Sequence, residues 1–279
     1  MADFSALLIA IGFTLLWQTS QTINFAQGEF VTLPAFFMLA AMRAGLPFWA
    51  AILVGFALSI ALLGFAFKRL LVDPMLRHGV LPLAIATMAL STFLKESVKT
   101  FYSAEASPFP SIAPDVDAHI FGVPVSWQNI AALGVAFAAV VALQFFLRRT
   151  RTGRQMQAAA QNPTVARIIG VPVERMILYT FLINGALVAL ASLLISPIYL
   201  AKFSNGDTLG LAAFIAAIVG GFNQVRGAIA GGLLLGVVDN LSAAYVSTQY
   251  RGALPLFLLI AIILLRPEGL LGRAEERTV

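Results

Sequence analysis

The chain has 279 residues, of which 59% are hydrophobic and 11% charged, and its mean hydropathy is +0.89. Soluble proteins carry about 25% charged residues, and so few polar groups could not cover this much apolar surface, so the composition predicts an integral membrane protein. With no cysteine and only two histidines, His78 and His119, disulfides, cysteine catalysis and a histidine-rich metal site are excluded. The net charge of +5 is interpreted through its distribution between loops and not as nucleic-acid binding.

Long apolar runs recur along the chain without the strict alternation of β-barrel strands. Because unpaired backbone amides are costly in lipid, such runs predict spanning helices. We expect an all-α, polytopic bundle with eight or nine crossings, forming one transmembrane domain over residues 1–279. A straight crossing needs about 20 residues, so the second and seventh runs are interpreted as half-helices or re-entrant segments. The predicted spans are Ala6–Thr22, Phe30–Met42, Phe48–Phe67, Leu81–Val98, Trp127–Leu147, Met176–Ile198, Leu209–Gly221, Ala228–Tyr245 and Leu254–Leu265.

Basic residues are distributed unequally between the two sides of this predicted bundle. One side, with the loops 68–78, 148–175 and 224–227 and the tail from Arg266, holds 13 of the 18 Lys and Arg residues. The positive-inside rule makes that side cytoplasmic. With nine crossings the N-terminus is then periplasmic and the C-terminus cytoplasmic. The first residues lack the basic flank and cleavage site of a signal peptide, so no removal on export is expected.

Two connecting segments are long enough to have structure of their own. The external segment Tyr102–Ser126 contains four prolines, Pro108, Pro110, Pro114 and Pro124, and therefore cannot be one continuous helix. We expect it to be an ordered, mildly acidic external cover.

The cytoplasmic segment 148–175 has helical composition but no membrane-length apolar run. A first short helix is predicted from about Gly153 to Gln161, and Asn162 and Pro163 are favourable N-cap and N1 residues for a second one that ends at Gly170. The segment is either a solvated loop whose charges set the topology or a compact docking element whose alanine face lets another protein approach. The residues assigned to docking are Arg154, Met156, Ala159, Ala160, Asn162, Pro163, Arg167 and Gly170.

Polar residues interrupt the apolar pattern between the first two predicted spans. Asn24, Gln27 and Glu29 stand there beside Gly28. Discontinuous helices with polar residues at membrane depth are a common way to build a substrate site. These three residues therefore either line a substrate pathway or form an interfacial turn in which Glu29 is favoured by the dipole of the following helix.

Glycines are dense at helical spacing near the C-terminal end, where small-xxx-small patterns favour close helix packing. They are Gly220, Gly221, Gly227, Gly231, Gly232 and Gly236. Asp239 follows them and is interpreted as a structural residue. No G-x-x-x-x-G-K-[ST] motif and no Ser/His/Asp arrangement occurs, so the sequence predicts neither P-loop ATP binding nor hydrolysis by this chain.

Four of these segments, taken together, resemble the membrane-spanning permease of branched-chain amino acid ABC transporters. The resemblance is to the H-type subunit of the high-affinity leucine/isoleucine/valine system and covers nearly the whole chain. The segments that carry it are Ile23–Glu29, Gly153–Gly170, Gly220–Gly236 and Arg266–Gly272. The family usually has histidine at the position of Gln27, so no proton-linked role is expected there.

The resemblance implies a type II-like importer permease in a bacterial inner membrane. Such a permease is not an enzyme: it forms half of a translocation pathway with a second, homologous permease, as a hetero- or homodimer. Two cytoplasmic ATPase subunits, which bind ATP and Mg, and a periplasmic solute-binding protein complete the importer. The segment Gly153–Gly170 is then the coupling element.

The resemblance implies branched-chain or related amino acids as the solute, with urea, amides and aromatic or short carboxylates as alternatives within the same family. An ion-coupled carrier that uses Glu29 and Asp239 is a further alternative from the residues alone, and a membrane scaffold or receptor is another.

Overall fold

The computed structural model of the protein describes residues 4–20, 23–114, 116–120, 123–222, 224–245 and 253–272. Helices dominate these residues. In chain order the elements are α1 (Phe4–Ser20), α2 (Gln27–Arg43), α3 (Phe48–Leu58), the π-helical stretches η1 (Ser59–Ala66) and η2 (Lys68–Val72), α4 (Asp73–Leu76), α5 (Val80–Phe101), β1 (Asp117–Ile120), β2 (Val123–Ser126), α6 (Trp127–Arg149), α7 (Arg151–Gln161), α8 (Pro163–Ile168), α9 (Val173–Tyr199), α10 (Asn205–Gly220), α11 (Val225–Tyr245) and α12 (Ala253–Leu265).

Among the described residues, five helices are long and apolar enough to cross a membrane. They are the helix that runs through α3, η1, η2 and α4, together with α5, α6, α9 and α11. The apolar stretches Leu7–Thr19, Asn205–Gly220 and Ala253–Leu265 are shorter. The run predicted as 30–42 belongs to α2, which has 17 residues, and the run predicted as 209–221 belongs to α10, which has 16.

The third predicted span is longer than expected, since the helix continues through η1 and η2 to Leu76. Its π-helical part packs backbone to backbone on α9: a Cβ on Gly64 would lie 3.0 Å from the Phe181 carbonyl oxygen, and one on Gly185 would lie 3.1 Å from Ile60 Cα. Near its end Lys68, which is 4% exposed, pairs with Asp73 at 2.8 Å. π-Helical turns interrupt regular helices mostly where packing or function demands them, and here they coincide with this close contact.

The segment 102–126, predicted to be external, adds one short β-hairpin to a mostly helical fold. β1 and β2 form an antiparallel hairpin in which Asp117 pairs with Ser126 and His119 with Pro124. Proline lacks the N–H that an inner strand needs, but it is tolerated in a two-stranded ribbon, where one edge of each strand is unpaired. The hairpin leads directly into α6, whose N-cap Ser126 accepts a hydrogen bond from the Gln128 N–H.

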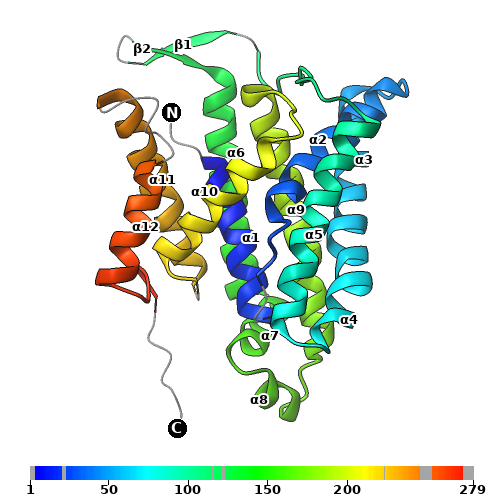
Figure 1. Ribbon diagram of the computed structural model, residues 1–279, viewed down its shortest axis with the longest axis vertical. Coiled ribbons are helices and arrows are strands. Elements are labelled where there is room, and N and C mark those ends of the chain that lie inside the picture. Colours follow the sequence, from blue (N-terminus) through cyan, green and yellow to red (C-terminus); the bar gives the residue numbers. More distant parts are fainter. Residues whose placement is uncertain are drawn as a thin grey trace.

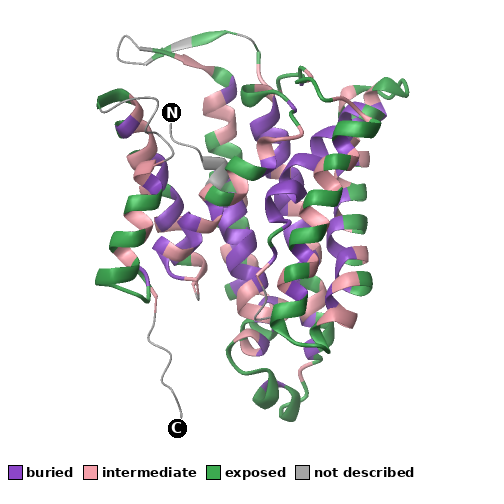
Figure 2. Cartoon of the chain, viewed as in Figure 1, coloured by how far each residue is buried: buried purple, intermediate pink, exposed green. Residues whose placement is uncertain are grey.

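The bundle has a buried centre and an exposed periphery. Figure 2 shows buried residues concentrated in α1, α2, α9 and α10, whereas α5 and α12 carry many exposed apolar side chains. The hairpin lies at one end of the bundle, and α7 and α8 lie at the opposite end (Figure 1). α1 packs against α10, as α9 packs against α2, and α2 and α10 also contact one another.

The C-terminal glycines make backbone contacts between neighbouring helices. A Cβ on Gly220 would clash with the carbonyl of Gly227 in α11, and a Cβ on Gly231 would clash with the carbonyl of Ala216 in α10. Gly232 instead faces Leu7 of α1, and Gly236 is buried in α11.

The segment that follows α12 is fixed to the end of α10. The backbone N–H groups of Leu270 and Leu271 donate to the carbonyls of Val219 and Gly220 at 2.9 and 3.0 Å. Gly221 and Gly269 both have positive φ, +105° and +80°, and lie against one another at this contact. Residues with a side chain rarely adopt a positive φ, which explains why glycine occupies both positions.

Candidate functional site

Two short helices begin inside the bundle with the same pattern of residues. α2 begins Gln27-Gly28-Glu29 and α10 begins Asn205-Gly206-Asp207, so each has an amide, a glycine and a carboxylate in its first turn. A phenylalanine stands two residues before each tripeptide. From here the helices run in opposite directions, α2 toward the hairpin end and α10 away from it (Figure 1). We call the two tripeptides together the α2–α10 junction.

Glycine allows the two helix starts to touch. A Cβ on Gly28 would clash with the carbonyl of Gly206 and lie 3.1 Å from Gly210 Cα. A Cβ on Gly206 would lie 2.5 Å from Glu29 Oε1. The carboxylate of Glu29 therefore lies directly on the first turn of α10, where only a residue without a side chain fits.

Three charges meet at the junction. Glu29 is 3% exposed, and it interacts electrostatically with Asp207 and with Lys95 of α5. Lys95 Nζ forms an ion pair with the Asp207 carboxylate, and the two side chains are 27% and 53% exposed. The positive ends of two helix dipoles favour carboxylates here. The junction thus combines a buried carboxylate with a neighbouring ion pair that is partly exposed.

The amides of Asn24 and Gln27 are engaged in an internal network. Gln27 Nε2 donates to Asn184 Oδ1 of α9 at 2.8 Å, and Asn184 Nδ2 donates back to Gln27 Oε1 at 3.1 Å. Asn24 Nδ2 donates to the same Gln27 oxygen at 3.2 Å. Gln27 and Asn184 are fully buried, and Gly12 of α1 leaves the space for both amides. These side chains hold α1, α2 and α9 in register, and a solute contact through them stays a prediction.

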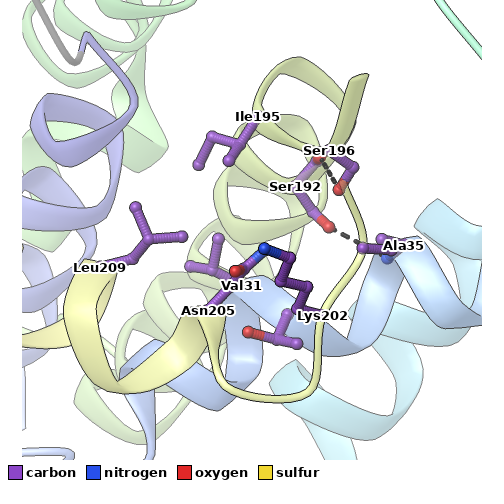
Figure 3. A pocket seen from close by; sticks show the side chains of 10 residues that line it. Val31, Ala35, Ser192, Ile195, Ser196, Lys202, Asn205 and Leu209 are labelled. Atoms are coloured by element: carbon purple, nitrogen blue, oxygen red, sulfur yellow. Dashed lines mark hydrogen bonds between the residues drawn. The ribbon is translucent and has the colours of Figure 1, made fainter. Parts of the chain in front are cut away.

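A small cavity lies between α2, α9 and the beginning of α10. Figure 3 shows the side chains of Val31, Ser192, Ser196 and Asn205 around it, with the Ser192 hydroxyl accepting a 3.0 Å hydrogen bond from the Ala35 N–H. Its volume of about 10 Å³ is close to that of one water molecule and too small for an amino acid.

One face of α5 is polar although α5 is a candidate span. Thr92, Glu96 and Thr100 are exposed on it, and with the exposed Phe93 and Phe101 they line a shallow surface depression. Ionisable and polar groups facing lipid are costly. This mixture of polar and aromatic side chains is therefore better suited to contact with another protein than to lipid alone.

The segment predicted to be cytoplasmic folds into the α7–α8 knuckle (151–170). The Thr150 hydroxyl accepts from the Gly153 N–H at 2.9 Å, so α7 begins two residues before the predicted start. Asn162 Oδ1 accepts from the N–H groups of Thr164 and Val165 at 3.1 and 3.0 Å, and Gly170 has φ +83°. The N-cap and terminating roles predicted for Asn162 and Gly170 are confirmed.

The knuckle has a packed base and an exposed tip, which corrects one expectation. Met156 and Ala159, each 2% exposed, face the bundle, so Ala159 is not part of a free alanine face. Three apolar side chains are exposed instead, Val165, Ile168 and Ile169, at 51%, 79% and 68%. Of the other residues assigned to docking, Arg154, Asn162, Pro163, Arg167 and Gly170 are exposed and Ala160 is half-buried.

The fold and these sites first define a class: a multi-pass helical membrane protein whose polar residues gather where short helices begin inside the bundle. Residues 4–263 match the family described as "Branched-chain amino acid transport system / permease component", and the chain belongs to this family.

Individual relatives agree with the family over nearly the whole chain. The high-affinity branched-chain amino acid transport system permease protein LivH of Escherichia coli (strain K12) is 32% identical, over 98% of this chain and 92% of its own length. BraD, which has the same description in Pseudomonas aeruginosa, is 32% identical over 98% and 93%. A probable LivH of Methanocaldococcus jannaschii is 26% identical over 95% and 88%. No solved structure matches significantly.

The structure brings together residues that the sequence does not connect. The sequence analysis singles out Glu29 with Asn24 and Gln27, and it assigns no role to Lys95 or Asp207. The repeated amide-glycine-carboxylate tripeptide is the signal that would have linked Glu29 to Asp207. Asn184, a single amide in an apolar helix, would have indicated the partner of Gln27.

Proposed function

We propose that the protein is the membrane-spanning permease subunit of an ATP-driven importer for branched-chain or related amino acids, forming half of the translocation pathway. The observation that carries this proposal is the match to permeases described for that transport over nearly the full length of both chains. The family favours this function over an ion-coupled carrier.

The energy enters through the α7–α8 knuckle. Two ATPase subunits, which bind ATP and Mg, dock on the exposed apolar tip formed by Val165, Ile168 and Ile169, with Arg154 and Arg167 nearby. The base of the knuckle packs on α1, α6 and α9. At Gly153 there is no room for a side chain against the Phe146 carbonyl and Leu147 Cα. Because α7 packs this closely on α6, a movement of the tip is transmitted to the bundle helices.

The remaining partners meet other faces of the bundle. A second, homologous permease faces the polar side of α5, and the solute passes between the two subunits. A periplasmic solute-binding protein docks at the hairpin end, which includes Tyr102–Ser126. In this arrangement the protein lies in a bacterial inner membrane. The knuckle and the C-terminus are on the cytoplasmic side, and the N-terminus is on the periplasmic side.

The test is leucine uptake by the complete importer reconstituted in proteoliposomes. Wild type should take up leucine in the presence of internal ATP, and Ile168→Glu combined with Ile169→Glu should abolish both uptake and ATPase retention on the permease. Gln157→Glu, an exposed change on α7, is the matched control and should leave uptake unchanged. Wild-type uptake by the double variant would refute docking at this tip, and gradient-driven uptake by the permease alone would refute the importer.

A further inference from the structure

Beside the α2–α10 junction, the carboxyl groups of Glu29 and Asp207 share one neighbouring ammonium group, that of Lys95. Lys95 forms its ion pair with Asp207, and within the described part of the chain no hydrogen bond reaches the Glu29 carboxylate, although this residue is 3% exposed. A buried carboxylate without a hydrogen-bonded partner is costly. A cationic group that reached Glu29 would therefore find a hydrogen-bond acceptor that Lys95 does not occupy.

The same ion pair gives access to the buried carboxylate. Lys95 and Asp207 both interact electrostatically with Glu29, are partly exposed, and belong to different helices. Helices α5 and α10 are not among the helix pairs with extensive contact, so this pair is a bridge between two otherwise separate elements. Separation of Lys95 from Asp207 would make the Lys95 ammonium and the carboxyl groups of Asp207 and Glu29 accessible to a bound molecule.

A free amino acid has complementary charges. Its ammonium group matches the Asp207 and Glu29 carboxylates, and its carboxylate matches the Lys95 ammonium. In the unliganded protein Lys95 and Asp207 pair with one another. In the liganded protein the amino acid's carboxylate would take the place of Asp207 beside Lys95, and its ammonium group would take the place of Lys95 beside Asp207. A lone amine or a lone acid would satisfy only one side of the separated pair.

Apolar side chains stand beside the charges on both helices. Leu211, 50% exposed, lies four residues after Asp207 on the same face of α10, and Met88, 49% exposed, lies seven residues before Lys95 on α5. Because α10 runs away from the hairpin end and α5 runs toward it (Figure 1), both lie on the knuckle side of the ion pair. Phe25, whose N–H donates to Thr87 of α5, is exposed at the same level. They offer a surface for a branched aliphatic side chain.

We propose that Lys95, Asp207 and Glu29 form a site of the permease that binds the ammonium and carboxylate groups of a free amino acid during translocation, with the amino-acid side chain against Leu211 and Met88. The proposal rests on the proposed function and adds a place and a charge pattern to it. The site selects zwitterions because both members of a separated ion pair must be satisfied at once.

The test uses the solubilised permease–ATPase complex without binding protein, with labelled leucine at equilibrium and two competitors. 3-Methylbutylamine is leucine without its carboxylate, and 4-methylpentanoate is leucine without its ammonium. Lys95→Gln should weaken leucine binding by about ten- to a hundred-fold, the usual effect of losing one charged hydrogen bond. It should not weaken the binding of 3-methylbutylamine, because the amine no longer has to displace Lys95 from Asp207. Asp207→Asn should weaken leucine and the amine alike. Arg77→Gln, which removes an exposed cation in the turn before α5, is the control and should change neither.

Equal weakening of leucine and amine by Lys95→Gln would overturn the site, because a merely structural ion pair would not discriminate between ligands. Wild-type leucine affinity in both variants would also overturn it, as would absent saturable binding in a complex that transports leucine. Leucine binding with the expected charge dependence, in a complex without ATP-driven uptake, would instead contradict the proposed function and leave the site standing.

Discussion

The α2–α10 junction and the α7–α8 knuckle are both formed where short helices begin with polar residues. They differ in which side chains are buried: the junction buries a charged group, and the knuckle exposes apolar ones. In the junction, Glu29 is buried and glycine backbones touch. In the knuckle, Ile168 and Ile169 are exposed beyond a packed base. The junction should therefore tolerate almost no change in shape, whereas the tip of the knuckle should tolerate change in the isolated protein and fail only when a partner is needed.

The strongest effect on folding is expected at the base of the knuckle. Ala159→Asp places a carboxylate among buried groups, and burying an unpaired charge costs several kcal/mol. Gln157→Asp adds the same charge to an exposed position of α7 and should be nearly neutral. Thermal unfolding of the purified permease, with limited proteolysis of the 150–170 segment, measures the difference; equal melting temperatures would mean that Ala159 is not enclosed.

Next in size is the glycine contact of the junction. Gly28→Ala introduces a methyl group against the Gly206 carbonyl and should lower the free energy of unfolding by about 1–3 kcal/mol. Gly134 of α6 has no neighbour within 4 Å, so Gly134→Ala should be neutral or slightly stabilising through helix propensity. A chemical-denaturation series in detergent compares them, and a Gly28→Ala protein as stable as Gly134→Ala would contradict the close approach of the two helix starts.

A smaller effect is expected when the amide network is replaced as a whole. Asn184→Leu leaves the buried Gln27 Nε2 group without its acceptor, although Gln27 Oε1 keeps its bond from Asn24, and should cost about 1–3 kcal/mol. Adding Gln27→Leu should recover part of that loss. The double-mutant cycle thus predicts strong coupling between positions 27 and 184. Independent, additive losses in the melting temperature would show that these amides do not depend on one another.

The sequence predicts the knuckle better than the junction because their signals have different ranges. Asn162, Pro163 and Gly170 act within a few residues of where they stand, so the two helices and their ends follow from local rules. The exposed tip at Ile168 and Ile169 does not follow from such rules, since burial of α7 on the bundle depends on α1, α6 and α9.

The junction depends on contacts between distant residues, which patterns along the chain do not reveal. Gln27 meets Asn184 across 157 positions, and Lys95 meets Asp207 across 112. The polar break at Asn24, Gln27 and Glu29 is evident in the sequence, but its partners are not. The β1–β2 hairpin is not predicted for a simpler reason: its four-residue strands are too short for an alternating pattern to be recognised among the prolines.

The central claim is that a nucleotide-hydrolysing partner drives this permease from the side on which the knuckle lies. The chain has no cysteine, so Ile168→Cys supplies a unique thiol at the exposed tip. In a membrane that contains the whole importer, a short bifunctional reagent should cross-link this thiol to the ATPase subunit, and an impermeant maleimide should label it in inverted vesicles but not in intact cells. Labelling of the introduced thiol from outside intact cells, without a cross-link to the ATPase, would contradict the account.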